Sequence, residues 1–190
     1  DVATGQKPKH LTRFMARWWN DSLYFGIRCD FDQNEPPIVG SQQDRDPAIW
    51  QGEHLELLIE TDKHSYYQIV VNPAGALIDL DRAVKLPQAY QWSSQAEVAA
   101  HVGEDFWSVE LRLPVTSSDE DPLHQMIGSR PFQSKQESLD SGKGTSLPWY
   151  FNLYRKRSGS NDVETTAFSP LGPEAKSFHV PLKFARIYVQ

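Results

Sequence analysis

Two acidic side chains, Glu53 and Glu56, are the first candidates for acid–base chemistry in this chain of 190 residues. Hydrolysis of a glycosidic bond needs two carboxyl groups that face each other across a cleft. The residue pattern predicts a strand from His54 to Glu60, and strand positions an odd number apart point to opposite faces. Glu53 and Glu56 therefore cannot act as a pair, which argues against a catalytic dyad at this place.

Other catalytic signatures do not occur in the sequence. It contains no Gly-x-Ser-x-Gly elbow, no glycine-rich phosphate loop and no His-Glu-x-x-His helix. The six histidines show no close metal-ligand spacing, and isolated histidines are more often surface or capping groups than ligands. We therefore expect a chain that is not itself an enzyme, although a glycoside hydrolase could be attached to it.

Loop aromatic residues suggest a different chemistry, the binding of a sugar. A flat ring can cover the C–H face of a pyranose while charged or amide groups hydrogen-bond to its hydroxyls. Trp50 follows the polar segment 44–49 and precedes the strand that carries Glu56, and Trp92 also has a loop setting. Packing in the core or at its rim is an equally good interpretation of Trp50.

These side chains need a scaffold, and apolar and polar residues alternate in many short segments. Helical periodicity is not sustained for three turns anywhere, and 13 prolines punctuate the chain. The pattern predicts an all-β fold, an antiparallel, jelly-roll-like β-sandwich of immunoglobulin-like size that forms a single domain over residues 1–190. The expected strands are 14–19, 23–31, 54–60, 66–72, 76–81, 97–102, 106–114, 149–157 and 182–189.

Residues 115–147 differ in composition from the rest of the chain, because Ser, Asp, Gln, Gly and Lys dominate there. This stretch is too polar for a core strand and too long for a tight turn. We interpret it as a polar surface insertion, with a short helix near 123–127. The single cysteine, Cys29, lies in an alternating segment and is expected to be a buried small hydrophobic side chain.

Composition limits the classes of partner. Hydrophobic residues make up 39% and charged residues 23% of the chain, as in globular proteins. The net charge of −6 comes without any block of Lys and Arg, which argues against nucleic acid as a partner. No apolar run approaches the roughly 20 residues of a membrane span. A chain that opens at Asp1 without Met also looks like a module taken from something longer.

Seven segments in order resemble the family 9 carbohydrate-binding modules, which are related to the haem-binding DOMON sandwiches. The most telling are the opening hairpin 14–31, with Trp-Asn-Asp-Ser-Leu-Tyr at 19–24, and Ile-Trp-Gln-Gly-Glu-His-Leu-Glu-Leu at 49–57. The other segments are 66–75, 107–114, 151–155, 167–170 and 178–184. The resemblance covers all but the N-terminal tail and the insertion.

The resemblance implies a secreted, periplasmic or cell-surface module that serves polysaccharide catabolism. Such modules hold the end of a glucan or xylan chain between two tryptophans. Trp50 matches the first stacking ring, Glu56 the hydroxyl-binding carboxylate and Arg155 a sugar-binding arginine. Phe168 stands in the place of the second tryptophan, which is a departure, because phenylalanine offers less surface and no N–H.

Two amides and several aspartates complete the expected site. Asn152 and Gln68 either bind sugar or satisfy neighbouring backbone groups as strand amides. Structural calcium is the one cofactor that the resemblance leaves open, although no calcium-loop motif occurs. The carboxylates in loop-like settings are Asp30, Asp32, Asp44, Asp46, Asp79 and Asp81.

Two alternatives remain open at the level of sequence. The related haem-binding sandwiches use axial Met or Lys and His ligands, for which Met15 and His179 are the nominees. The chain could also be an interaction module of a multidomain protein that has kept the sandwich and lost the sugar site, because fold does not dictate function. The departure at Phe168 favours this second alternative.

Overall fold

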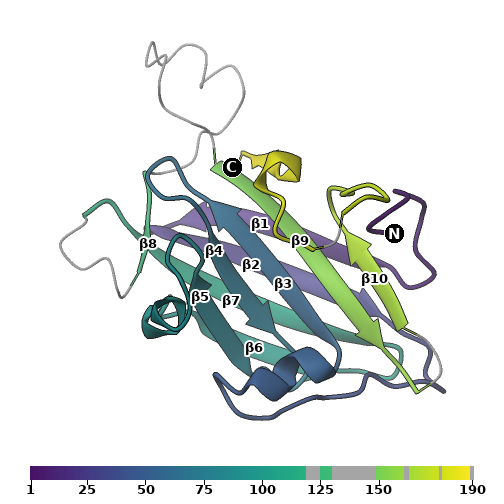
Figure 1. Ribbon diagram of the computed structural model, residues 1–190. Coiled ribbons are helices and arrows are strands. Elements are labelled where there is room, and N and C mark those ends of the chain that lie inside the picture. The colour runs from purple at the N-terminus through teal and green to yellow at the C-terminus, as the bar shows by residue number, and fades with distance from the viewer. Residues whose placement is uncertain (119–124, 130–148, 161–162, 176, 189–190) are drawn as a thin grey trace.

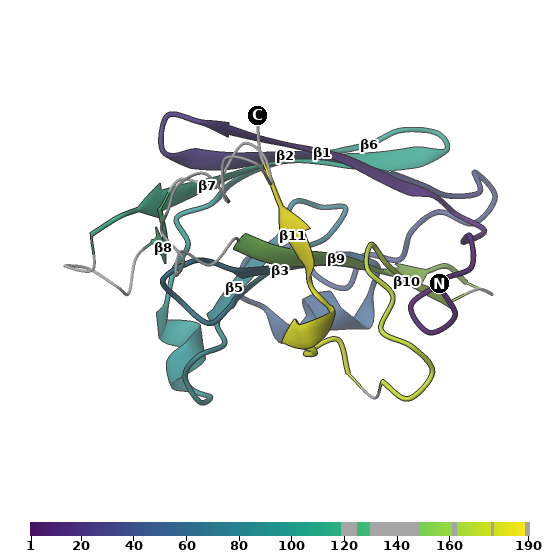
Figure 2. The same cartoon turned by 90° about the horizontal axis from the view of Figure 1, so that it is seen from above.

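Two β-sheets pack face to face in the computed structural model, which describes residues 1–118, 125–129, 149–160, 163–175 and 177–188 (Figures 1 and 2). Sheet A has the strand order β1-β2-β7-β6, with β8 pairing with β7. Sheet B has the order β10-β9-β3-β4-β5, with β11 pairing with β9. The described pairs are antiparallel except β7 with β8, so the predicted antiparallel sandwich is confirmed.

The element bounds are as follows. Sheet A contains β1 (Thr12–Trp19), β2 (Ser22–Asp30), β6 (Glu97–Val102), β7 (Phe106–Thr116) and β8 (Met126–Ile127). Sheet B contains β3 (His54–Glu60), β4 (Tyr67–Val71), β5 (Leu77–Asp81), β9 (Trp149–Ser158), β10 (Val163–Ala167) and β11 (Ala185–Ile187). Three short 3-10 helices are η1 (Pro47–Gln51), η2 (Gln88–Gln91) and η3 (Pro181–Lys183).

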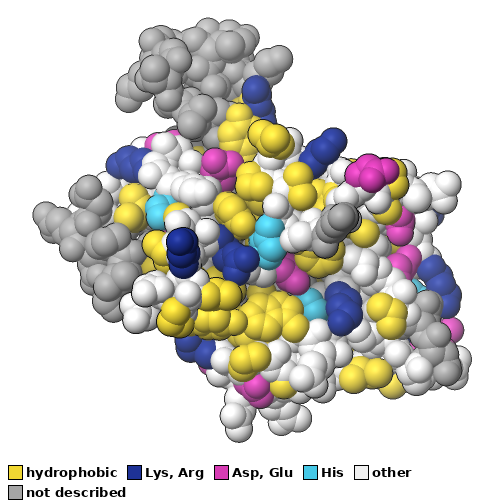
Figure 3. Space-filling model, viewed as in Figure 1, with side chains coloured by type: hydrophobic (Ala, Val, Ile, Leu, Met, Phe, Trp, Pro, Cys, Tyr) yellow, Lys and Arg dark blue, Asp and Glu magenta, His cyan; other side chains and the backbone are white. Residues whose placement is uncertain are grey.

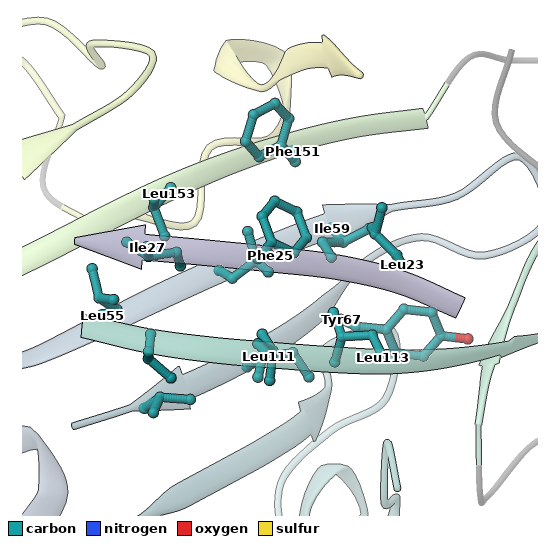
Figure 4. Close-up of a cluster of buried hydrophobic side chains, with 14 of the residues drawn as sticks. Leu23, Phe25, Ile27, Leu55, Ile59, Tyr67, Leu111, Leu113, Phe151 and Leu153 are labelled. Atoms are coloured by element: carbon teal, nitrogen blue, oxygen red, sulfur yellow. The ribbon is translucent and has the colours of Figure 1, made fainter. Parts of the chain in front are cut away.

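The core lies between the sheets and consists of every second residue of the facing strands. Figure 4 shows these side chains pointing into the space between the ribbons. Burial of one such leucine or phenylalanine contributes about 1.5–3 kcal/mol. The labelled members are Leu23, Phe25, Ile27, Leu55, Ile59, Tyr67, Leu111, Leu113, Phe151 and Leu153.

The hairpin of β1 and β2 shows how the sequence closes a turn. Asn20 and Asp21 form the two-residue connection, and both have positive φ, of 44° and 52°. Two-residue hairpin loops favour this backbone because its twist matches that of the strands, and Asn and Asp tolerate it. The turn fixes the register, which pairs Trp18 with Leu23.

The structure differs from the expected elements at three places. Strand β10 was not predicted, because its sequence is polar and it lies at the edge of sheet B. The expected strand 182–189 is instead the helix η3 followed by the short strand β11, and residues 189–190 lie outside the described part. The prediction of a short helix near 123–127 is wrong for the described residues of that range, because Met126 and Ile127 are buried and form β8.

The expected insertion 115–147 lies largely outside the described residues, at 119–124 and 130–148. Its described parts include Val115 and Thr116, which end β7, and β8 beside them. Among the described residues, no helix is long and apolar enough to cross a membrane.

Candidate functional site

Strand β3 presents different residues to the two sides of sheet B. Leu55, Leu57 and Ile59 belong to the core between the sheets. His54 and Glu56 point the other way, to the outer face. Figure 3 views this outer face and shows hydrophobic, basic, acidic and histidine side chains gathered near its centre.

Two neighbours hold the Glu56 carboxylate in place. Gln68 Nε2 on β4 donates a hydrogen bond of 2.6 Å to Oε2, and His54 Nε2 lies 3.2 Å from Oε1. His54 Nδ1 lies 2.9 Å from the Gly52 carbonyl, which can only accept, so Nδ1 carries a proton. Glu56 is thus an oriented oxygen acceptor in a site where water is largely excluded.

The helix η1 places Trp50 on the same face of sheet B as this carboxylate. Asp46 caps η1 by accepting a hydrogen bond from the Ala48 N–H at 2.9 Å. The Ser41 hydroxyl also donates to Asp46, at 2.6 Å. The bonds from Ser41 and Ala48 hold the pKa of Asp46 below its ordinary value. The indole is half-buried and packs on an apolar cluster of the outer face that includes Val70. Val70 pairs directly with Glu56, so the ring and the carboxylate share one face.

A second aromatic group lies on the opposite side of Glu56. Tyr154 on β9 pairs directly with Glu56, and the ring of Phe178 stacks on the ring of Tyr154 with centroids 4.4 Å apart. The Tyr154 hydroxyl donates to the Phe178 carbonyl at 3.1 Å. Burial raises the pKa of Tyr154, which therefore stays protonated at neutral pH. The Tyr154–Phe178 stack thus lies next to Glu56 on the β9 side, and Trp50 lies on the same face, on the side of β4 and β5.

Three polar side chains form a third wall. Arg82 Nη2 donates to His179 Nε2 at 3.3 Å, so the proton of a neutral His179 sits on Nδ1, which lies 3.2 Å from the Tyr66 hydroxyl. Burial and the positive charge of Arg82 lower the pKa of His179, and the charge of Glu56 opposes them. His179 is therefore neutral at pH 7, and Arg82 supplies the positive charge of this wall.

The structure brings together three of the six residues expected from the sequence, Trp50, Glu56 and Gln68. Asn152 is fully buried, and all its amide groups bond within the chain, to the Tyr154 hydroxyl and to backbone groups of Leu153 and Ser169. Its contribution is to hold Tyr154 in place.

The structure puts Arg155 and Phe168 on the other side of sheet B. Arg155 is 1% exposed and donates to the buried Glu53 carboxylate from Nε and Nη2, at 3.0 and 2.6 Å. The Phe168 ring stacks on Phe151 at 5.2 Å and meets Phe14 edge-on at 5.1 Å. Neither side chain shares a face with Glu56.

Comparison with solved structures shows what scaffold carries this face. A candidate carbohydrate-binding protein from Bacteroides uniformis ATCC 8492 superposes with a TM-score of 0.64 and 15% identity over 96% of this chain and 80% of its own. A family 9 carbohydrate-binding module from Caldicellulosiruptor kristjanssonii, in complex with glucose, gives 0.59 and 12% over 98% and 80%. Its complex with cellotriose gives 0.57 and 10% over 98% and 79%.

The chain has the fold of the family 9 carbohydrate-binding modules. The predicted resemblance is confirmed at the level of the fold, although no family model matches the sequence. No curated protein matches it either. At identities of 10–15% the family 9 scaffold survives in shape while most side chains differ.

Sequence reasoning missed several side chains on this face of the family 9 fold. Ile78, Leu80 and Arg82 alternate along and just beyond β5, so parity alone could have assigned Arg82 to the face of Glu56. Phe178 and His179 arrive on the loop before η3, far away in sequence. No local pattern indicates where that loop docks.

The aspartates suggested for calcium by the family 9 resemblance take part in hydrogen bonds within the chain. Within the described ranges, no three His, Cys, Asp or Glu side chains form a group that could hold a metal ion. The carboxylates already accept hydrogen bonds from the chain itself; Asp79, for example, bonds with Arg45 and Ser94.

The two haem-ligand nominees lie on opposite outer faces of the family 9 sandwich. Met15 is 78% exposed on sheet A, on the strand side away from Phe14. His179 contacts Tyr66 and Arg82 on the outer face of sheet B. These two side chains cannot coordinate one iron together.

Proposed function

We propose that this chain is a non-catalytic carbohydrate-binding module that recognises the end of a glucan- or xylan-type chain on the outer face of sheet B. The observation that carries the proposal is that Glu56 shares the outer face of sheet B with two aromatic groups, Trp50 from η1 and the Tyr154–Phe178 stack. The structural neighbours from Caldicellulosiruptor kristjanssonii, which were solved with glucose and cellotriose, support it.

Each side chain of the face has a separate task in this proposal. The Trp50 ring covers the C–H face of the terminal sugar. Glu56 accepts hydrogen bonds from neighbouring hydroxyls, and Gln68 and His54 keep it from rotating away. Arg82 donates to sugar oxygens from the other wall. A ring together with fixed acceptors and donors matches a neutral polyhydroxy ligand.

Binding of a polymer end places the module outside the cell or at its surface, where such polymers are met. Its benefit there is to hold a substrate near other domains of a parent chain, such as a glycoside hydrolase. Glu53, the other carboxylate considered for catalysis, points into the interior and does not share the face of Glu56. The module therefore contributes binding and leaves hydrolysis to another domain.

Titration with cellotriose and xylotriose, followed by tryptophan fluorescence and calorimetry, tests the proposal. Wild-type protein should bind one of them, and Trp50→Ala should abolish binding while the protein stays folded. Leu182→Ala removes a 97% exposed apolar side chain of η3 and is the matched control, which should bind like wild type. Equal affinity of Trp50→Ala and wild type would refute the site. Folded wild-type protein that binds no sugar would instead favour an interaction module.

A further inference from the structure

The outer face of sheet A is a second exposed surface with aromatic and polar side chains. Figure 2 shows the three short helices on the sheet B side of the molecule, and none of the described helices lies over sheet A. Strand register arranges the outward residues of β1, β2, β7 and β6 in cross-strand rows. One row is Arg17, Tyr24, Arg112 and Glu97, and the next is Met15, Gly26, Glu110 and Ala99.

Gly26 opens a trough in the middle of this face. Its strand neighbours show that a side chain at this position would point outward, and a Cβ atom built there meets nothing within 4 Å. The trough has a volume of about 460 Å³. It is lined by Tyr24, Phe25, Gly26, Glu97, Val98, Ala99, Glu110, Leu111 and Arg112.

A second hollow lies next to the trough on the same face. It is lined by Arg17, Trp19 and Tyr24, and Tyr24 belongs to both hollows. The Trp19 ring is 56% exposed and tilts toward the ring of Tyr24 at a centroid distance of 6.3 Å. Two aromatic rings thus stand beside solvent-open hollows that share Tyr24.

The polar side chains of the two hollows are largely uncommitted. In the described part of the chain, Arg17, Glu110 and the Tyr24 hydroxyl make no hydrogen bond or ion pair. Arg112, in contrast, is held by Glu97 at 2.5 Å and by the Ser22 hydroxyl at 3.2 Å. The surface therefore offers free donors and free acceptors together, with no excess of one charge sign.

We propose that this face is a second glycan-binding surface, which takes the interior of a neutral polysaccharide chain. Rings flanked by uncommitted donors and acceptors match a polyhydroxy ligand, and the balance of charges matches a neutral one. Tyr24 lines both hollows and no described element lies over them, so a chain can pass across both. The face is distinct from that of Trp50, and binding at both would let one module hold two places on a polymer.

Native-gel retardation in soluble xylan and hydroxyethylcellulose tests this surface when it is carried out in the Trp50→Ala background. Gly26→Val is the main variant, because it places a side chain in the trough, in a strand where valine is favoured, and its Cβ atom meets nothing within 4 Å. We expect Trp50→Ala to be retarded still, and the added Gly26→Val to weaken retardation about tenfold or more. Tyr24→Ala should act in the same direction.

The outcomes separate this proposal from the end-binding site. Gly26→Val alone should bind cellotriose as wild type does, which also shows that it is folded. Loss of all retardation in Trp50→Ala, or unchanged retardation after Gly26→Val is added, overturns the second surface and leaves the first intact. If the protein does not bind cellotriose but is retarded, and Gly26→Val removes this retardation, the second surface is supported and the end-binding site is not. Stronger retardation by an anionic polymer such as polygalacturonate overturns the assignment to a neutral chain.

Discussion

Glu53 and Glu56 are three positions apart in the sequence, yet they lie in opposite chemical environments. Glu53 is fully buried between the sheets, where Oε1 accepts from the Trp107 indole at 2.6 Å and from Arg155, and Oε2 lies 3.3 Å from Arg157 Nη1. Glu56 lies on the outer face, where its partners among the described residues are His54 and Gln68. The first carboxylate is surrounded by protein donors, whereas the second, which is 6% exposed, accepts from one amide donor beside one imidazole.

This difference shows how residue type alone can mislead. Both are glutamates next to a tryptophan segment, but only strand parity and the side on which the second sheet packs decide which one can meet a ligand. Buried ion pairs of this kind are costly to break, because the remaining charge has no water to solvate it. The interior carboxylate therefore serves the fold, and we propose that the outer one serves recognition.

The largest expected effect is on stability at the interior carboxylate. Glu53→Gln leaves Arg155 and Arg157 without a counter-charge and should cost about 3–5 kcal/mol. In a chain of this size that corresponds to a Tm lower by roughly 10 °C. Thermal and urea unfolding measure it, with the exposed Glu104→Gln as the charge-matched control. A change below about 1 kcal/mol would show that the network is dispensable.

Glu56→Gln should have a small effect on stability and a large effect on sugar affinity. Stability should fall by about 1 kcal/mol, because only the contacts with His54 and Gln68 change. Oligosaccharide affinity should fall about 10- to 100-fold, as expected when a charge-assisted hydrogen bond to the ligand is lost. Calorimetry and urea unfolding of the same sample separate the two quantities. If Glu56→Gln loses stability like Glu53→Gln and keeps its affinity, the distinction between the two carboxylates fails.

A smaller effect is expected in the pH dependence of stability, through His179 on the outer face of sheet B. The folded chain holds the pKa of His179 below its ordinary value of 6.5, through burial and the charge of Arg82. Between pH 6.5 and the lower folded pKa, the unfolded chain binds the proton and the folded chain does not, so acid favours unfolding. Relative to His179→Gln, wild-type stability should fall as pH drops below 6.5 and then level off. Urea unfolding from pH 7.5 to 4.5 and an NMR titration of the imidazole measure this, and a folded midpoint above 6.5 contradicts it.

The smallest effect concerns the thiol on the interior side. Burial raises the pKa of Cys29 to about 12, so the native chain should not react with iodoacetamide at pH 8. Glu53→Gln should accelerate labelling by making transient opening of the interior more frequent, whereas Glu56→Gln should not. Mass spectrometry over a time course measures the rates. Rapid labelling of the wild type would mean that the interior opens more easily than its packing indicates.

Much of the scaffold could be predicted because strands follow local alternation. His54 to Glu60 and Glu97 to Val102 have the expected bounds, and the turn at Asn20-Asp21 joins the expected hairpin. The strand β10 escaped prediction, because an edge strand with polar residues has no local signature. Chain ends such as 182–189 failed for a similar reason, since their structure depends on what they pack against.

The candidate site divides along the same line. The shared face of Trp50, Glu56 and Gln68 could be predicted, because these residues lie on or next to well-patterned strands. Arg155 shares the parity of Phe151 and Leu153 on β9, so alternation already indicated an interior position that the resemblance obscured. Phe178 and His179 had no such signal, because the loop that carries them meets Tyr154 and Arg82 only after folding.

The sequence by itself determined which residues alternate, where the chain turns, and that Glu53 and Glu56 face opposite ways, because these properties depend on neighbours a few bonds away. Tertiary structure alone decided which of the two faces the second sheet would seal. It also decided which distant rings and charges would assemble around the carboxylate left outside. That choice rests on the packing of segments more than 100 residues apart, for which local residue patterns carry no information.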